Sequence, residues 1–236
     1  MSAARAATGK STGRGASNVV LVHGAYADGS SWSKVIPLLQ KAGLRVTSVQ
    51  NPLTSLADDA EAVRFALSRQ DGPTVLVAHS YGGTVISEVG LAENVTGLVY
   101  VAARAPEAGE DFAALSSTYP TPPVTPGIVS SGGFKWLTQD AFLRDFANGV
   151  SREEALALYA TQGLLSTAAP TTSAAAWQEK PSWYAVSRDD RTINPDLQRF
   201  MAQRMKATTV EVEAGHLSLI THPRQISRLI LAAAAV

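Results

Sequence analysis

The sequence predicts an α/β protein whose six strands form one mostly parallel sheet with helices on both faces. Short runs of β-branched and apolar residues alternate with helical patterns from Asn18 onward, which is typical of strand–helix–strand units. The strand segments at 19–22, 74–78 and 97–102 are almost entirely apolar, as expected for parallel strands that are buried on both faces. Of the 236 residues, 45% are hydrophobic and 17% are charged, so the chain can form a core of domain size.

Four strands and three helices are predicted in the first half of the chain. The strand segments, which are rich in Val and Leu, lie at 19–22, 45–49, 74–78 and 97–102. The helical segments carry apolar residues on one face and lie at 30–41, 56–67 and 84–91. Thr54 or Ser55 caps the second helix, which ends before Gly72 and Pro73 because proline cannot continue a helix.

The second half of the chain contains a predicted insertion. Seven of the 12 prolines lie within 105–181, residues 113–134 carry no charge, and Ser151 with Glu154 forms a capping box for a helix. The regular pattern then returns, with strands at 183–187 and 208–212 and helices at 195–205 and 223–234. We therefore predict a core made of 18–104 and 182–236, a helical lid inserted at 105–181, and a flexible N-terminal tail at 1–17.

Charge and composition exclude several classes of function. The 20 Lys and Arg residues balance the 20 Asp and Glu residues, so the basic excess of nucleic-acid and membrane-surface proteins is missing. No apolar run approaches the roughly 18 residues of a membrane-spanning helix, and residues 1–17 lack the apolar stretch of a secretory signal. Without cysteine there is no thiolate chemistry, and no His, Asp and Glu spacing indicates a metal site. We expect a cytoplasmic monomer or homodimer that acts on a small molecule.

A candidate nucleophile follows the third predicted strand. Residues 78–82, Ala-His-Ser-Tyr-Gly, match the G-x-S-x-G elbow with alanine in its first position. The turn is strained and presents the serine at its tip, so the neighbouring residues must be small. A helix begins at the same place, and its amide groups favour developing negative charge. Ser80 is therefore a candidate nucleophile; the alternative is a tight turn in which Ser80 only caps the helix.

A serine nucleophile needs a base and a carboxylate that orients the base. His216 follows the last predicted strand, and Asp189 and Asp190 follow the strand before it. The carboxyl ends of parallel strands meet at one edge of the sheet, where α/β proteins bind their ligands. We assign His216 as general base and acid, with a helix-capping histidine as the alternative. We favour Asp190 over Asp189 as the acid, because the residues after Asp190 fit a loop that returns to a helix.

Acyl transfer also needs hydrogen-bond donors for the negative charge that develops on the carbonyl oxygen. The first strand ends in His23-Gly24-Ala25, where glycine lets the backbone turn toward the site. We expect the backbone N–H groups of Ala25 and Tyr81 to form this oxyanion hole. His23 and His79 are expected to have structural roles.

Four residues are tentative members of a substrate pocket. Gly24 and Tyr26 adjoin the expected oxyanion turn, and Trp136 and Trp177 lie in the predicted lid. The alternative for the two tryptophans is that they form the small core that holds the lid on the sheet. A mostly uncharged lid favours a neutral, moderately apolar ester or lactone as the substrate.

Four segments resemble the α/β-hydrolase superfamily and stand in the order seen there: HGAYADGSSW, AHSYGG, DDRTINP and EAGHLSL. The branch that they resemble contains the plant methylesterases and hydroxynitrile lyases with their small bacterial relatives, and the resemblance covers nearly the whole chain from Asn18 to Ala234. It implies a bacterial, cofactor-free serine hydrolase with a lid. It also implies that Ser80, Asp190 and His216 are the triad, with Ala25 and Tyr81 as oxyanion donors.

Departures from the branch favour ester hydrolysis. The plant esterases carry a second histidine and a tryptophan where this chain has Ala27 and Ser30, so plant-hormone esters are not implied. The lyases carry threonine in place of Gly24 and lysine in place of Leu217. A carboxylesterase that works through an acyl-enzyme is therefore expected. The alternatives are a ligand-binding protein of the same fold with little turnover, and a lyase or perhydrolase on the same scaffold.

Overall fold

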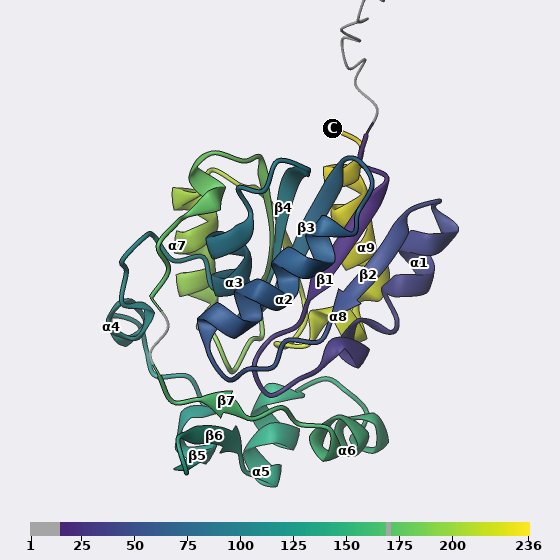
Figure 1. The fold of residues 1–236 in the computed structure, drawn as a ribbon. Helices are drawn as coiled ribbons and strands as arrows, with labels where there is room; N and C mark the ends of the chain where they lie inside the picture. The colour runs from purple at the N-terminus through teal and green to yellow at the C-terminus, as the bar shows by residue number, and fades with distance from the viewer. Residues whose placement is uncertain (1–14, 169–170) are drawn as a thin grey trace, which may run out of the picture.

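A computed structural model of the chain describes residues 15–168 and 171–236 and contains a six-stranded parallel sheet (Figure 1). The strand order across the sheet is β2-β1-β3-β4-β8-β9. In chain order the strands are β1 (Asn18–Val22), β2 (Arg45–Val49), β3 (Thr74–His79), β4 (Val95–Val101), β8 (Ser182–Ser187) and β9 (Thr208–Val212). The predicted α/β class and its six strands are confirmed.

Burial explains why the strand segments are so apolar. Every residue of β1, β3 and β8 is buried, whereas β2 and β9 at the two edges of the sheet are partly exposed. Helices cover both faces of the central strands, so these strands lack the alternation of apolar and polar residues that marks a half-exposed strand. Consecutive residues of β1 and β3 pair in register from Asn18 with Thr74 to Val22 with Ala78. Their carboxyl ends therefore meet at one edge of the sheet.

The helices form two layers, one on each face of the sheet (Figure 1). One layer contains α2 (Leu56–Ser68), α3 (Gly82–Val89) and α7 (Pro195–Arg204), and the other contains α1 (Ile36–Lys41) and α9 (Pro223–Ala234). Ser55 caps α2 by accepting a hydrogen bond from the N–H of Asp58. Proline occupies the first turn of both α7 and α9, where its missing N–H would have no partner in the helix.

The helix predicted at 30–41 is instead two short elements. A 3₁₀ helix, η1, spans Gly29–Trp32, and α1 begins only at Ile36. Between them, the N–H of Val35 bonds the carbonyl of Trp32, which is a tight i to i−3 contact. Pro37 also has no N–H to donate to the carbonyl of Ser33. The apolar residues follow a helical pattern here, but the turn at Val35 and the missing N–H of Pro37 interrupt the backbone hydrogen bonds that one continuous α-helix needs.

Much of the 105–181 segment lies beyond the carboxyl ends of the strands (Figure 1). Its helical elements are α4 (Phe112–Ser117), η2 (Thr125–Gly127), α5 (Gln139–Ala141), the π-helix η3 (Phe142–Phe146), α6 (Arg152–Ala160) and η4 (Ala176–Gln178). Of these, α4 lies beside the sheet and its helices, and η4 packs against α3. It also contains a small antiparallel sheet of β5 (Ile128–Ser131), β6 (Phe134–Leu137) and β7 (Leu165–Ser166). The sequence analysis did not predict these strands because they are only two to four residues long.

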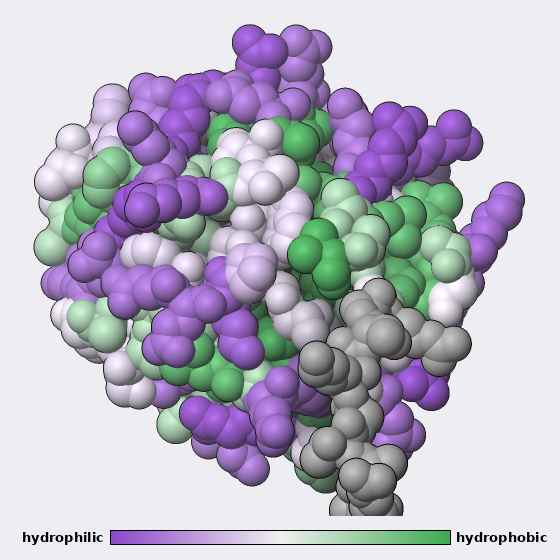
Figure 2. Space-filling model, turned by 90° about the horizontal axis from the view of Figure 1, so that it is seen from above, coloured by the Kyte–Doolittle hydropathy of each residue, from purple (hydrophilic) through white to green (hydrophobic). Residues whose placement is uncertain are grey.

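Both described ends of the chain lie at the opposite end of the molecule, where the strands begin. Of the predicted tail, residues 1–14 fall outside the described residues. The N–H of Ala16 bonds the carbonyl of Ala234, and that of Ser17 bonds the carbonyl of Pro73, so the packed chain starts before Asn18. Figure 2 shows this end, where apolar areas are interspersed with hydrophilic residues. No helix among the described residues is long and apolar enough to cross a membrane.

Candidate active site

Ser80 lies at a sharp turn between β3 and α3. Its φ angle is 53°, in the left-handed region that non-glycine residues rarely adopt, and its side chain is nearly buried, with a residue exposure of 6%. A Cβ atom on Gly24 would lie 2.7 Å from the Cβ of Ser80, and a Cβ on Gly82 would lie 2.7 Å from the carbonyl oxygen of His23. A side chain at Gly24 or Gly82 would therefore clash with its neighbours, and the loop after β1 packs directly against Ser80.

Ser80, His216 and Asp190 form a continuous hydrogen-bonded chain. The Nε2 atom of His216 lies 2.9 Å from the Oγ of Ser80, and its Nδ1 lies 2.7 Å from the Oδ2 of Asp190. Because the carboxylate can only accept, Nδ1 carries a hydrogen and Nε2 is left to accept the serine proton. His216 follows β9 and is fully buried, which excludes water from the pair. The structure thus brings together the three residues predicted from strands that are far apart in the sequence.

The carboxylate of Asp190 is held by three further donors. Its Oδ1 accepts the backbone N–H groups of Thr192 at 2.7 Å and Ile193 at 3.0 Å, and its Oδ2 accepts the side-chain amide of Gln198 at 2.7 Å. Asp189 is exposed, and its backbone N–H and carbonyl bond Ala214 and Asn148 instead. Of the two adjacent aspartates, only Asp190 contacts the imidazole of His216.

Gln198 was missed by the sequence analysis. It lies on α7 with no exposed surface, and its Oε1 also accepts the N–H of Ser187 at the end of β8. Its amide therefore links β8, the Asp190 loop and α7 in one network. A glutamine on an amphipathic helix carries no signal of this kind in the sequence, because glutamine is common on exposed helix faces.

Two other histidines support the site, as expected. His79 donates from Nε2 to the carbonyl oxygen of His216 at 3.0 Å, and burial together with the His216 ring lowers the pKa of His79 well below its usual value. His23 accepts the N–H of Asn51 at Nε2 and bonds the Gly24 carbonyl through Nδ1, and burial lowers its pKa as well. Both rings are thereby kept neutral, and they hold the loops that carry His216 and the expected oxyanion donors.

The expected oxyanion donors have no acceptor within the part of the chain that the structure describes. Among the residues that the structure describes, neither the N–H of Ala25 nor that of Tyr81 donates to a backbone or side-chain acceptor. Tyr81 follows Ser80 directly and precedes α3, and Ala25 follows Gly24 in the loop packed against Ser80. Both groups are therefore available to bind a negatively charged oxygen.

A buried carboxyl group anchors the side chain of Tyr81. The Tyr81 hydroxyl donates to the Oδ2 of Asp59 at 2.7 Å, and the N–H of Leu53 donates to the Oδ1 at 2.7 Å. Asp59 lies on α2 with no exposed surface, and this burial raises its pKa. The sequence analysis did not single out Asp59, because an aspartate in the first turn of a helix is usually explained by the helix dipole.

Replacing Asp59 with asparagine is expected to flatten the pH dependence of stability. The folded protein binds the Asp59 proton more tightly than the unfolded chain, so the free energy of unfolding falls as the pH rises from the unfolded pKa, about 3.9, through the raised folded pKa. Asparagine at this position cannot ionise, so the free energy of unfolding of D59N should not show this decrease with pH. Urea unfolding at several pH values measures it, with the variant E61Q, at an exposed position of the same helix, as control. An unchanged slope in D59N would contradict the assignment.

The four tentative pocket residues separate into two pairs. Gly24 lies against Ser80. The ring of Tyr26 packs edge-on against the ring of Phe146, with 6.0 Å between the ring centres. The Phe146 ring in turn lies 5.2 Å from the ring of His216. Trp177 donates to the carbonyl of Pro106 and packs under Arg204. Trp136 and Leu137 are adjacent on β6 and therefore point to opposite faces of the small sheet. No described contact connects either tryptophan with the triad; Trp177 is buried and belongs to the hydrophobic core, whereas Trp136 is half-buried on the face of β6 opposite Leu137.

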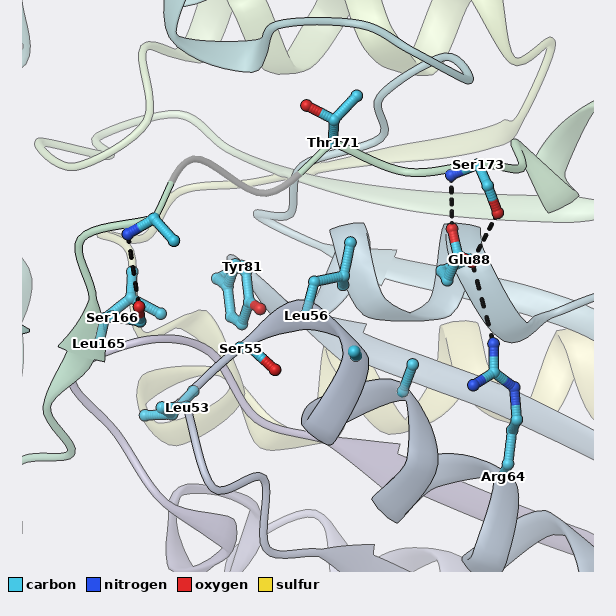
Figure 3. A pocket seen from close by; sticks show the side chains of 13 residues that line it. Leu53, Ser55, Leu56, Arg64, Tyr81, Glu88, Leu165, Ser166, Thr171 and Ser173 are labelled. Carbon is cyan, nitrogen blue, oxygen red and sulfur yellow. Dashed lines mark hydrogen bonds and ion pairs between the residues drawn. The ribbon is translucent and has the colours of Figure 1, made fainter.

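A cavity of about 390 Å³ opens beside Tyr81 (Figure 3). Its walls come from α2, α3 and the stretch around β7, and they are mainly apolar, with Leu53, Leu56 and Leu165 near Tyr81. At its far side, Glu88 accepts hydrogen bonds from the N–H and the hydroxyl of Ser173, both at 2.7 Å. None of the four predicted pocket residues lines this cavity.

Within 15–168 and 171–236, no cluster of three His, Asp or Glu side chains could hold a metal ion.

Comparisons with known proteins show the family and the fold. A family model described as the alpha/beta hydrolase family matches residues 19–229. The alpha/beta hydrolase nvfD of Aspergillus novofumigatus is 28% identical, over 92% of this chain and 96% of its own length. The pyrethroid hydrolase of Sphingobium wenxiniae is 26% identical, over 90% of this chain and 86% of its own. The crystal structure of polyneuridine aldehyde esterase has a TM-score of 0.78 at 18% identity, over 92% of this chain and 98% of its own, which shows a shared fold.

Proposed function

The chain belongs to the alpha/beta hydrolase family, and from this premise we propose that it is a serine carboxylesterase that cleaves a small carboxylic ester or lactone through an acyl-enzyme on Ser80. The observation that carries the proposal is the continuous contact from Ser80 through His216 to Asp190, at 2.9 and 2.7 Å. A cytoplasmic location, a bacterial origin and a monomeric or homodimeric state stay predictions.

The reaction follows from the hydrogen-bond pattern. The Oγ of Ser80 attacks the ester carbonyl while the Nε2 of His216 takes its proton, and Asp190 stabilises the imidazolium through Nδ1. The N–H groups of Ala25 and Tyr81 bind the oxyanion of the tetrahedral intermediate. His216 then returns the proton to the leaving alcohol. A water molecule, deprotonated by the same imidazole, attacks the acyl-enzyme and releases the acid. The site residues of this scheme need no cofactor.

The cavity beside Tyr81 supports a small substrate with an apolar part. Its leucine-rich wall lies next to the residue that follows the nucleophile. The uncharged stretch at 113–134 favours a neutral ester, whereas the side chains of Arg104 and Lys135 bring positive charge toward the same region. The positive charges of these two side chains would favour an ester that also carries a negatively charged group.

Labelling with a fluorophosphonate tests the nucleophile. We expect one equivalent of the reagent to attach to Ser80, located by peptide mass spectrometry, because among the serines that the structure describes only this one has an imidazole within hydrogen-bonding distance. The variant H216N should label far more slowly at the same pH. Product analysis with simple esters should give acid and alcohol. An unlabelled Ser80 in a folded protein would contradict the proposal and favour a ligand-binding protein of the same fold.

A further inference from the structure

Arg104 lies beside the nucleophile and has no acidic partner. It follows β4, and its backbone N–H bonds the carbonyl of Ser80 at 3.0 Å. Its guanidinium lies 4.7 Å from the ring centre of Phe112 and 5.9 Å from that of Tyr81. The aromatic rings cover the faces of the guanidinium and leave its N–H edges to bind another group.

No carboxylate of the protein neutralises this charge. Within the described residues, no Asp or Glu oxygen lies within 4.0 Å of the Arg104 side chain, and its buried Nε has no hydrogen-bond partner. Residues 1–14 and 169–170, outside the described part, contain neither Asp nor Glu. By contrast, the similarly enclosed Arg204 binds both carboxylate oxygens of Glu110, each at 2.7 Å. Among the described residues, Arg204 therefore has a carboxylate partner and Arg104 has none, although the Nε atoms of both are buried without a hydrogen-bond partner.

Lys135 adds a second positive charge to the same region. It is half-buried on β6, on the face that also carries the fully buried Leu137. Burial and the charge of Arg104 both lower the pKa of Lys135. No carboxylate among the described residues forms an ion pair with Lys135 either. A desolvated cation without a counterion destabilises the free protein, and an anion bound to Arg104 would remove this penalty.

We propose that Arg104 forms an anion subsite beside Ser80 and that the substrate is an ester bearing a second, ionised carboxylate, such as the half-ester of a dicarboxylic acid. The inference rests on the proposed esterase function and names its substrate class. A guanidinium with free N–H edges binds a carboxylate in bidentate geometry. The apolar remainder of the ester then lies toward Tyr81.

Paired substrates that differ only in charge test the subsite. Monomethyl glutarate carries the free carboxylate, and dimethyl glutarate has the same chain without it. With acid release followed at constant pH, we expect kcat/KM to favour the half-ester by about 10–100-fold, as hydrogen bonds to a charged group allow. R104Q should abolish the preference and R104E should reverse it. R69Q is the matched control: Arg69 is exposed over the Phe65 ring at 5.8 Å and should leave the preference unchanged.

Two further measurements separate this proposal from the proposed function. Calorimetry should detect glutarate binding to S80A and its loss in the S80A/R104Q double variant, without any turnover. R104M should raise Tm, because it removes an unpaired charge from a desolvated site. If wild type cleaves dimethyl glutarate at least as well as the half-ester, the subsite is wrong and the esterase stands. If neither ester is cleaved and Ser80 is unlabelled, the esterase is wrong, and glutarate binding alone decides the subsite.

Discussion

Replacing Ser80 with alanine is expected to lower kcat for ester hydrolysis by about 10⁶-fold, the loss seen when the nucleophile of a serine hydrolase is removed. The variant keeps the oxyanion amides of Ala25 and Tyr81 but leaves His216 with no hydroxyl to deprotonate. The fold should be retained, because alanine avoids the clash that a larger residue would make in the close contact with Gly24. Steady-state kinetics on the best ester measures the loss, and circular dichroism confirms the fold.

Ser87 provides a matched control for S80A. It lies two turns further along α3, is equally enclosed, and its hydroxyl donates to the carbonyl of Gly83 and contacts the hydroxyl of Tyr100. S87A is expected to lower stability by about 1 kcal/mol through the lost hydrogen bond, with no comparable effect on kcat. If S80A were as active as S87A, Ser80 would not be the nucleophile.

Replacing Asp190 with asparagine is expected to lower kcat by about 10⁴-fold, as the equivalent change does in a serine triad. The Oδ1 position accepts two backbone N–H groups, so the amide oxygen of asparagine is held there and the NH₂ group is turned toward His216. That NH₂ group donates to Nδ1 and drives the hydrogen onto Nε2. His216 can then no longer accept the proton of Ser80.

The adjacent aspartate is the control for this prediction. Asp189 is exposed, and only its backbone bonds the neighbouring loops, so D189N should retain wild-type kcat and KM. Steady-state kinetics of both variants on one ester gives the comparison. Full activity in D190N, or equal losses in both variants, would contradict the assignment of Asp190 as the orienting acid.

Local sequence patterns were sufficient for most of the fold. The strands at 45–49 and 208–212 were predicted to the residue, because β-branched runs bounded by turns mark strands in an α/β core. The same patterns failed at 29–41, where a proline and tight turns divide the apolar stretch into two short elements. They also failed at β5, β6 and β7, which are too short to have a periodicity of their own.

The supporting residues of the candidate site were beyond sequence reasoning. Asp59 holds the Tyr81 side chain, and Gln198 holds the Asp190 carboxylate, yet each lies on a helix where a polar residue is ordinary. Their importance depends on burial and on partners from other elements, neither of which a local pattern records. The pocket role of Trp136 and Trp177 stays a prediction, because an aromatic residue in an insertion suggests a pocket as readily as a small core.

The sequence by itself determined the α/β class, the place of the serine elbow, and the order of nucleophile, acid and base along the chain, since these depend on neighbouring residues. Only the tertiary structure decided that Asp190 rather than Asp189 contacts His216, and that Arg104 stands beside Ser80 without a carboxylate. The physical reason is the same in both cases. Contacts of about 3 Å between residues that are distant in the chain depend on how strands and loops pack, and composition reports only that the total charge is zero.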